Sequence, residues 1–136
     1  MPAAFAESLE ESPRGTLHLK IHSSGLLLAT VRGHYGVDLL HPYLRALADV
    51  ARSNRAIGFH DWEGMVSYDS ECRRSMTRWT LQNISRVAKV HILVKHRLVA
   101  MGVATGSMLV GRNLVTAHTR RSEFEERFRE ASRDLG

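Results

Sequence analysis

The sequence has a single cysteine, Cys72, and no long hydrophobic run among its 136 residues. One thiol excludes a disulfide within the chain and a zinc site built from four thiolates, and it fits a reducing compartment. No stretch approaches the roughly 18 apolar residues that span a bilayer. The start, MPAAFAESLEESPRG, has acids where a signal peptide carries a basic flank and an apolar stretch, so we expect a soluble, cytoplasmic protein.

The length and the 43% hydrophobic content suit one packed domain. Residues 1–15, with Pro2, Pro13 and Gly15, show no stable apolar period. We therefore predict a flexible leader over residues 1–15 and a single domain over residues 16–136.

The net charge of +5 is concentrated in the middle of the chain, where residues 51–100 hold nine Lys/Arg against four Asp/Glu. Arg74, Arg78 and Arg86 recur at four-residue steps or multiples of them, which predicts a basic stripe on one face of a helix. A solvated face and a surface for an acidic protein partner are both compatible with it. Aromatic residues do not interleave with these arginines and no nucleic-acid-binding motif occurs, which disfavours nucleic acid.

A β-hairpin is predicted near the start. Leu17, Leu19 and Ile21 alternate with polar residues, as in a strand with one wet face, and a second apolar run covers Leu26 to Arg32. Gly25 supplies the turn between the two runs.

The rest of the chain alternates between helical and strand patterns. Helices are predicted from Gly36 to about Asn54, over Ser70–Val87, over the small-residue segment Val99–Val110, and from Ser122 onward. Strands are predicted over residues 56–62, Lys89–Val94 and Leu114–His118. In the last helix, Ser122 and Glu125 form a capping-box pattern, and Phe124 and Phe128 are expected to be buried.

This order, β-β-α-β-α-β-α-β-α, predicts an α/β fold. Strands separated by single helices favour parallel pairing, so we expect a mixed, mostly parallel sheet with an N-terminal hairpin and about four helices. Interior strands are expected to carry Phe59, Ile92 and Val115.

At this point the chain resembles a known family. The hairpin, the alternation and the stretch DWEGMVSYDSEC, residues 61–72, look like the STAS domain, the SpoIIAA-like fold of bacterial anti-sigma-factor antagonists, over roughly Leu17 to Leu135. The resemblance implies a non-catalytic regulatory module that binds a kinase, an anti-sigma factor or another signalling protein. It makes Asp61 the strand-end acid, Asp69 the acid before the switch serine, and Ser70 the serine that a partner kinase phosphorylates. Where family members commonly continue with serine and glycine, this chain has Glu71 and Cys72, and a glutamate repels an incoming phosphate.

Ser70 has two interpretations. A phosphate at the first turn of a helix would meet free backbone N–H groups and change the charge presented to a partner. Alternatively, Ser70 is a helix cap, and Ser67 or Asp69 could also fill that role.

A second, looser resemblance connects the final helix and the run from Val87 to Val94 with the SEC14-type branch of the same fold. It implies an alternative function as a carrier of an apolar ligand or lipid. Gly102 and Gly106 would then form part of a pocket wall, although the same small residues also permit tight packing of a helix on a sheet.

The sequence contains no motif that supports an enzymatic or metal-dependent function. His60, His91 and His118 lie on separate predicted strands, and none belongs to an HxxxH or HxH pair. Cys72 has basic neighbours that could lower its pKa, but it shares a helix face with Met76 and Trp79, which predicts burial. No GxSxG elbow, phosphate loop or dinucleotide fingerprint is present, so we expect no catalysis and no cofactor, while self-association remains open.

Overall fold

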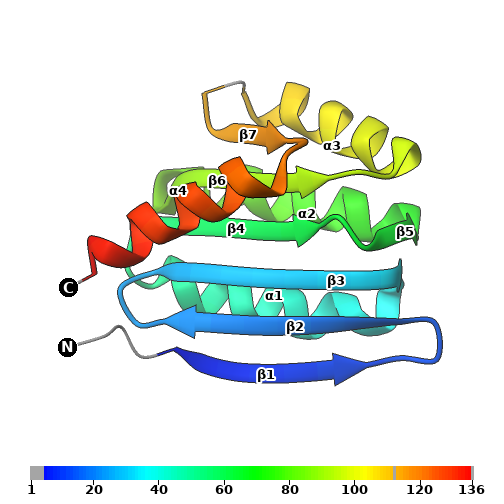
Figure 1. Cartoon of the computed structure of the whole chain (residues 1–136), viewed down its shortest axis with the longest axis horizontal. Helices are drawn as coiled ribbons and strands as arrows, with labels where there is room; N and C mark the ends of the chain where they lie inside the picture. The colour runs from blue at the N-terminus through cyan, green and yellow to red at the C-terminus, as the bar shows by residue number, and fades with distance from the viewer. Residues whose placement is uncertain (1–4, 112, 136) are drawn as a thin grey trace.

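Strands and helices alternate along residues 5–111 and 113–135, which are the residues that the computed structural model describes (Figure 1). The strands are β1 (Ala6–Glu11), β2 (Gly15–His22), β3 (Leu26–Tyr35), β4 (Ala56–Trp62), β5 (Met65–Tyr68), β6 (Val87–Val94) and β7 (Val115–His118). The helices are α1 (Val37–Ala51), α2 (Ser70–Gln82), the short 3-10 helix η1 (Ile84–Arg86), α3 (Arg97–Val110) and α4 (Arg121–Arg133).

The strands form one mixed sheet in the order β1-β2-β3-β4-β6-β7, with β5 paired to the end of β3. β2 is antiparallel to β1 and to β3, and the pairs from β3 onward are parallel. The predicted mixed, mostly parallel sheet with an opening hairpin is therefore confirmed. Gly25 makes the β2–β3 turn at φ 105°, a backbone conformation that glycine adopts without strain.

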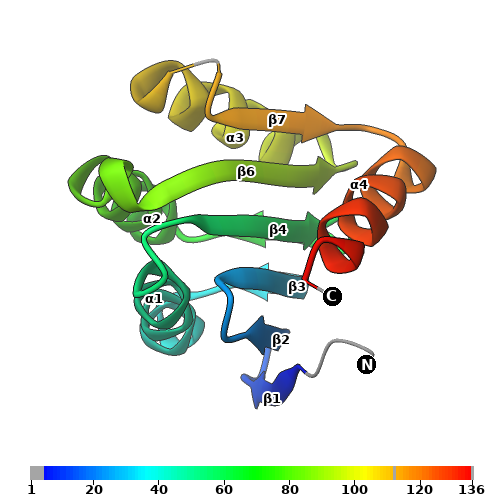
Figure 2. The same ribbon diagram turned by 90° about the vertical axis from the view of Figure 1, so that its left-hand side faces the viewer.

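Helices cover both faces of the sheet, with α1, α2 and α3 on one side and α4 on the other (Figure 2). The larger core lies under the three helices and includes Leu17, Leu39 and Tyr43. A smaller core under α4 contains Phe59 and Phe124, which make an edge-to-face contact at 5.5 Å between ring centroids. The predicted burial is confirmed for Phe124, whereas Phe128 is only half-buried.

Two predictions about the strands differ from the structure. Residues 6–11, assigned to the flexible leader, form β1, while residues 1–4 of that leader lie outside the described residues. β1 is exposed along its whole length, so backbone pairing with β2 rather than apolar burial defines it, and no apolar period marks it. Val115 is not on an interior strand, because β7 pairs only with β6 among the described strands.

Three element boundaries also differ. β5 was not predicted as a strand, because its residues lie in the junction between the predicted strand over residues 56–62 and the predicted helix that begins at Ser70. α2 ends at Gln82, where the Asn83 side chain donates to the Trp79 carbonyl at 2.9 Å and competes with helix continuation. α4 begins at Arg121, so Ser122 is already helical and the predicted capping box does not form.

Candidate functional site

The candidate site is the junction from β4 through β5 into α2. β5 brings Ser67 beside the end of β3, and Asp69 is the last residue before α2. Ser70 is the first residue of α2, and its side chain is exposed. Helices that follow parallel strands begin at the carboxyl end of the sheet, so α1, α2 and α3 all start along this edge.

His34, at the end of β3, connects the acid and one serine of the junction. Its Nδ1 lies 2.8 Å from Ser67 Oγ and its Nε2 lies 2.9 Å from Asp69 Oδ1. The other oxygen of Asp69 accepts a hydrogen bond from the Val37 backbone N–H at 3.0 Å. Asp69 therefore caps the start of α1, a helix that precedes it by 32 residues.

Electrostatics keeps Asp69 ionised. The Val37 N–H and the His34 side chain stabilise the carboxylate and hold the pKa of Asp69 below its usual range. Both carboxylate oxygens of Asp69 are thus engaged away from α2.

Ser67, Asp69 and Ser70 were the candidates for the side-chain cap of α2. Within the described part of the chain, no side-chain hydrogen bond caps α2. Ser67 bonds to His34, Asp69 bonds to His34 and α1, and Ser70 sits inside the helix rather than at the capping position. The interpretation of Ser70 as the cap of α2 is wrong, because Asp69 holds the N-cap position and directs its side chain elsewhere.

Glu71, the residue that departs from the family pattern, is exposed and takes part in an ion pair. Arg74 donates to one carboxylate oxygen at 3.1 Å and the Ser75 hydroxyl donates to the other at 3.2 Å. These bonds lower the pKa of Glu71. Its negative charge beside Ser70 is therefore partly compensated by Arg74.

The predicted basic stripe is divided between two elements. Arg74 and Arg78 are exposed on α2, whereas Arg86 lies in η1 beyond the end of α2. The four-residue spacing does not extend to Arg86 because the helix stops at Gln82.

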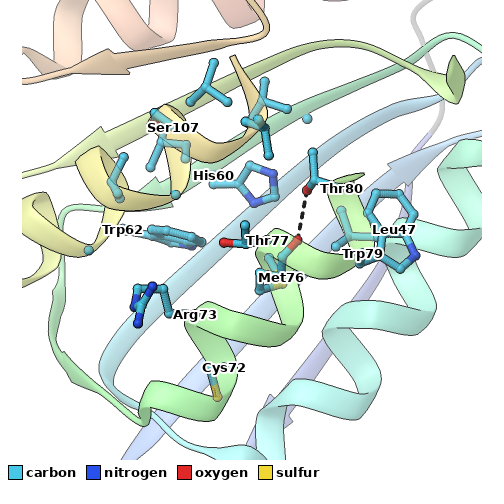
Figure 3. A pocket seen from close by; sticks show the side chains of 18 of the residues that line it. Leu47, His60, Trp62, Cys72, Arg73, Met76, Thr77, Trp79, Thr80 and Ser107 are labelled. Atoms are coloured by element: carbon cyan, nitrogen blue, oxygen red, sulfur yellow. Dashed lines mark hydrogen bonds between the residues drawn. The ribbon is translucent and has the colours of Figure 1, made fainter. Parts of the chain in front are cut away.

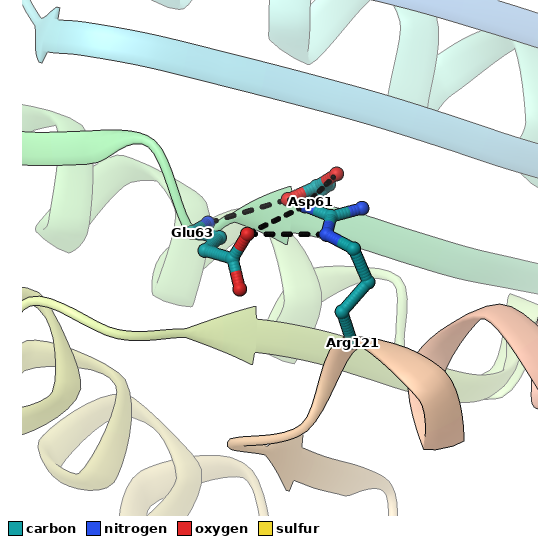
Figure 4. Close-up of polar contacts among 3 residues, drawn as sticks. All are labelled: Asp61, Glu63 and Arg121. Carbon is teal, nitrogen blue, oxygen red and sulfur yellow. Dashed lines mark hydrogen bonds and ion pairs between the residues drawn. The ribbon is translucent and has the colours of Figure 1, made fainter.

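Asp61 lies away from the Ser70 junction. Its carboxylate accepts hydrogen bonds from Arg121 at 3.0 and 2.9 Å, and Arg121 also donates to Glu63 at 3.1 Å (Figure 4). These ion pairs connect the start of α4 to the end of β4. The structure thus brings Asp69 and Ser70 together but directs Asp61 toward the α4 face.

Three histidines and the cysteine are at least partly buried: His60, His91, His118 and Cys72. His60 is buried and hydrogen-bonds to Tyr43, and burial lowers the pKa of His60 to about 3. His91 and His118 lie side by side, with Nδ1 of the first 2.9 Å from Nε2 of the second. Cys72 is buried, as predicted, and burial raises its pKa to about 12. In the described ranges, no group of three or more potential ligands could hold a metal ion.

An apolar cavity of about 110 Å³ lies between the sheet and helices α2 and α3 (Figure 3). Gly102 and Gly106 both line it. A Cβ atom at Gly102 would collide with the Tyr68 hydroxyl, and one at Gly106 would lie 3.2 Å from Thr77 Oγ1. The two glycines therefore allow close packing of α3 and also form part of the cavity wall.

Comparison with solved structures shows a SpoIIAA-like fold. The chain is similar to the crystal structure of an uncharacterized protein of the DUF3478 family with a SpoIIAA-like fold from Shewanella loihica PV-4. The similarity covers 91% of this chain and 93% of that chain, with a TM-score of 0.54 and 10% sequence identity. No protein-family model and no curated protein matches the sequence. The predicted SpoIIAA-like fold is confirmed, and over residues 5–111 and 113–135 no helix is long and apolar enough to cross a membrane.

Proposed function

We propose that this protein is a non-catalytic, cytoplasmic regulatory module of the STAS type that binds another signalling protein and is controlled by phosphorylation of Ser70. The observation that carries the proposal is the position of Ser70, which is exposed at the first residue of a 13-residue helix whose start receives no side-chain cap among the described residues. The SpoIIAA-like fold supports the class of module.

A phosphate on Ser70 would be stabilised locally. The Cys72 N–H donates to the Asp69 carbonyl at 2.9 Å, but the side chains of Ser67 and Asp69 bond elsewhere and leave the Ser70 and Glu71 amides at the start of α2 for phosphate oxygens. Arg74, one turn further along α2, adds a positive charge. The ion pair with Arg74 also reduces the repulsion that Glu71 would exert on the incoming phosphate.

The surface around Ser70 has features of a protein-binding region. α3 packs beside α2, and large apolar side chains are exposed near its start: Leu98 and Met101 are 59% and 62% exposed. Exposed apolar side chains grouped on one helix are typical of interaction surfaces. Since α2 and α3 start at the same edge of the sheet, a partner seated at this edge would sense a charge change at Ser70.

The test uses three tagged forms expressed in the source cell: wild type, Ser70→Ala and Ser70→Asp. Phosphosite mapping of the wild type should find phosphate on Ser70 and none on the buried Ser75. Quantitative co-purification should recover a kinase or sigma-regulating protein with wild type and Ser70→Ala, and at least tenfold less of its binding partner with Ser70→Asp. Absence of phosphate at Ser70 in every growth condition, together with equal partner recovery by all three forms, would refute the proposal.

A further inference from the structure

α3 presents an uncharged and largely apolar face to the outside of the molecule. The sequence has no charged residue between Arg97, the first residue of α3, and Arg112. Large apolar side chains are exposed towards both ends of the helix: Leu98, Met101, Met108 and Leu109 are 59%, 62%, 83% and 60% exposed. Apolar side chains exposed together on one helix mark an interaction surface rather than an ordinary solvated face.

The contacts of α3 within the chain use the other side of the helix. Gly102 packs against Tyr68 of β5, and Gly106 packs against Thr77 of α2. α3 is also the last helix of its layer and lies beside β7, at the end of the molecule farthest from β1 (Figure 1, Figure 2). A second molecule can therefore reach the exposed face of α3 along the length of the helix.

The order of side chains on this face suits packing against a second copy of itself. Two small exposed residues, Ala104 and Thr105, lie at its centre, and Met101 and Met108 flank them at equal distances in the sequence. Two α3 helices that cross antiparallel at this centre can approach closely there, because small side chains let the helix axes come together. The same two-fold arrangement places Met101 of each copy against Met108 of the other and opposes the two helix dipoles.

Other occupants fit this face less well. An acidic protein or a nucleic acid is recognised by basic groups, and residues 98–111 contain none. A helix that lies in a membrane interface typically carries lysine or arginine on its polar face and aromatic residues on its apolar face, and the same residues contain neither. A second copy of the chain brings the same neutral face, so contact between the two faces leaves no buried charge unpaired.

We propose that the protein forms a symmetric homodimer in which the exposed faces of two antiparallel α3 helices pack together around Ala104 and Thr105. The dimer does not depend on phosphorylation of Ser70. Leu98 and Met101 also belong to the surface proposed for the signalling partner, so dimerisation and binding of that partner would compete for α3.

The test measures dimerisation of the purified, unphosphorylated chain by sedimentation equilibrium. The wild type should change from monomer to dimer as its concentration rises. Met101→Lys and Met108→Glu should each weaken dimerisation by at least about tenfold, because each substitution buries two unpaired charges in the two-fold interface. An equimolar mixture of these two variants should dimerise more strongly than either variant alone, since the new lysine of one chain then faces the new glutamate of the other. Both positions are mainly exposed in the single chain, so the unfolding midpoint of each variant measured as a monomer should match that of the monomeric wild type.

Leu9→Glu is the matched control, because Leu9 is 55% exposed on β1 at the other end of the molecule, and this variant should dimerise like the wild type. A wild type that stays monomeric at every concentration would overturn the proposal. Binding of that monomer to vesicles of phosphatidylcholine and phosphatidylserine, if lost in Met108→Glu, would identify a lipid surface as the occupant instead. A dimer that both α3 variants leave intact would place the interface elsewhere. Recovery in a mixture of Met101→Lys with Met101→Glu, but not with Met108→Glu, would show parallel helices and contradict the antiparallel packing.

Discussion

Replacing Asp69 with alanine should destabilise the protein through α1, although Asp69 stands directly before α2 in the sequence. The substitution removes the acceptor for the Val37 N–H, which is worth about 1 kcal/mol for a helix cap. It also removes the hydrogen bond to His34, which contributes about 0.5–1 kcal/mol because the Asp69 side chain is 41% exposed. The free energy of unfolding should therefore fall by about 1.5–2 kcal/mol.

Ser70→Ala is the matched control, since it changes the neighbouring residue at the start of α2. The Ser70 hydroxyl caps no helix, so the loss should stay below about 0.5 kcal/mol. Asp69→Asn retains an acceptor for Val37 without the charge and should give an intermediate loss. Urea unfolding followed by the fluorescence of Trp62 and Trp79 measures all three variants. The reasoning fails if Asp69→Ala is as stable as the wild type, or if Ser70→Ala costs as much as Asp69→Ala.

The contribution of Asp69 also has a defined pH dependence. Its native pKa is lowered, so the stabilisation is complete above the pKa of the unfolded chain, about 3.9, and is lost as the pH falls through the lower native value. The difference in stability between wild type and Asp69→Ala should be constant from about pH 7 to 5 and should shrink below about pH 4. A difference that grows on acidification would contradict the bonding described for this carboxylate.

Three further outcomes are expected. Phe124→Ala should lower the free energy of unfolding in urea by about 3–5 kcal/mol, because the ring is 2% exposed. Phe128→Ala should lower it by less, because Phe128 is half-buried, and equal losses would contradict the packing of α4. The unfolded chain protonates His60 near pH 6.5 but the native chain only near pH 3. This residue should therefore lower stability by about 1.4 kcal/mol per pH unit as the pH falls from about 6.5 toward 3, and NMR should find its ring neutral at pH 5. Iodoacetamide should modify Cys72 rapidly in urea but not in the native protein, as mass spectrometry would show; fast native modification would place this thiol at the surface.

The sequence predicted a strand or helix correctly where only one face of that element is buried. Leu17 and Leu19 are buried while His18 and Lys20, which follow them in turn, are not, so the alternation identified β2. Phe124 was placed correctly for the same reason, since its helix has one apolar stripe. β1 was missed because a fully exposed edge strand has no apolar period, and Val115 was misplaced because the order of strands in a sheet follows from tertiary packing.

Only part of the candidate site could be predicted from the sequence. The stretch around Ser70 was found from its pattern, but the engagement of Asp69 with α1 depends on a contact across 32 residues. His34 was not singled out, because nothing local to β3 shows that it bridges Ser67 and Asp69.

The composition of β1 bears on how copies of this protein can meet in solution. β1 is an edge strand with the sequence AESLEE, and Glu7, Glu10 and Glu11 are exposed along it. Pairing of two copies through this edge would bring their negatively charged carboxylates together. The resulting repulsion opposes the growth of intermolecular β-structure. The opposite edge, β7, offers only four residues for such pairing. Assembly of identical chains would therefore proceed through helical surfaces, where the exposed apolar side chains of α3 are found, and the sheet itself is protected against fibrillar association.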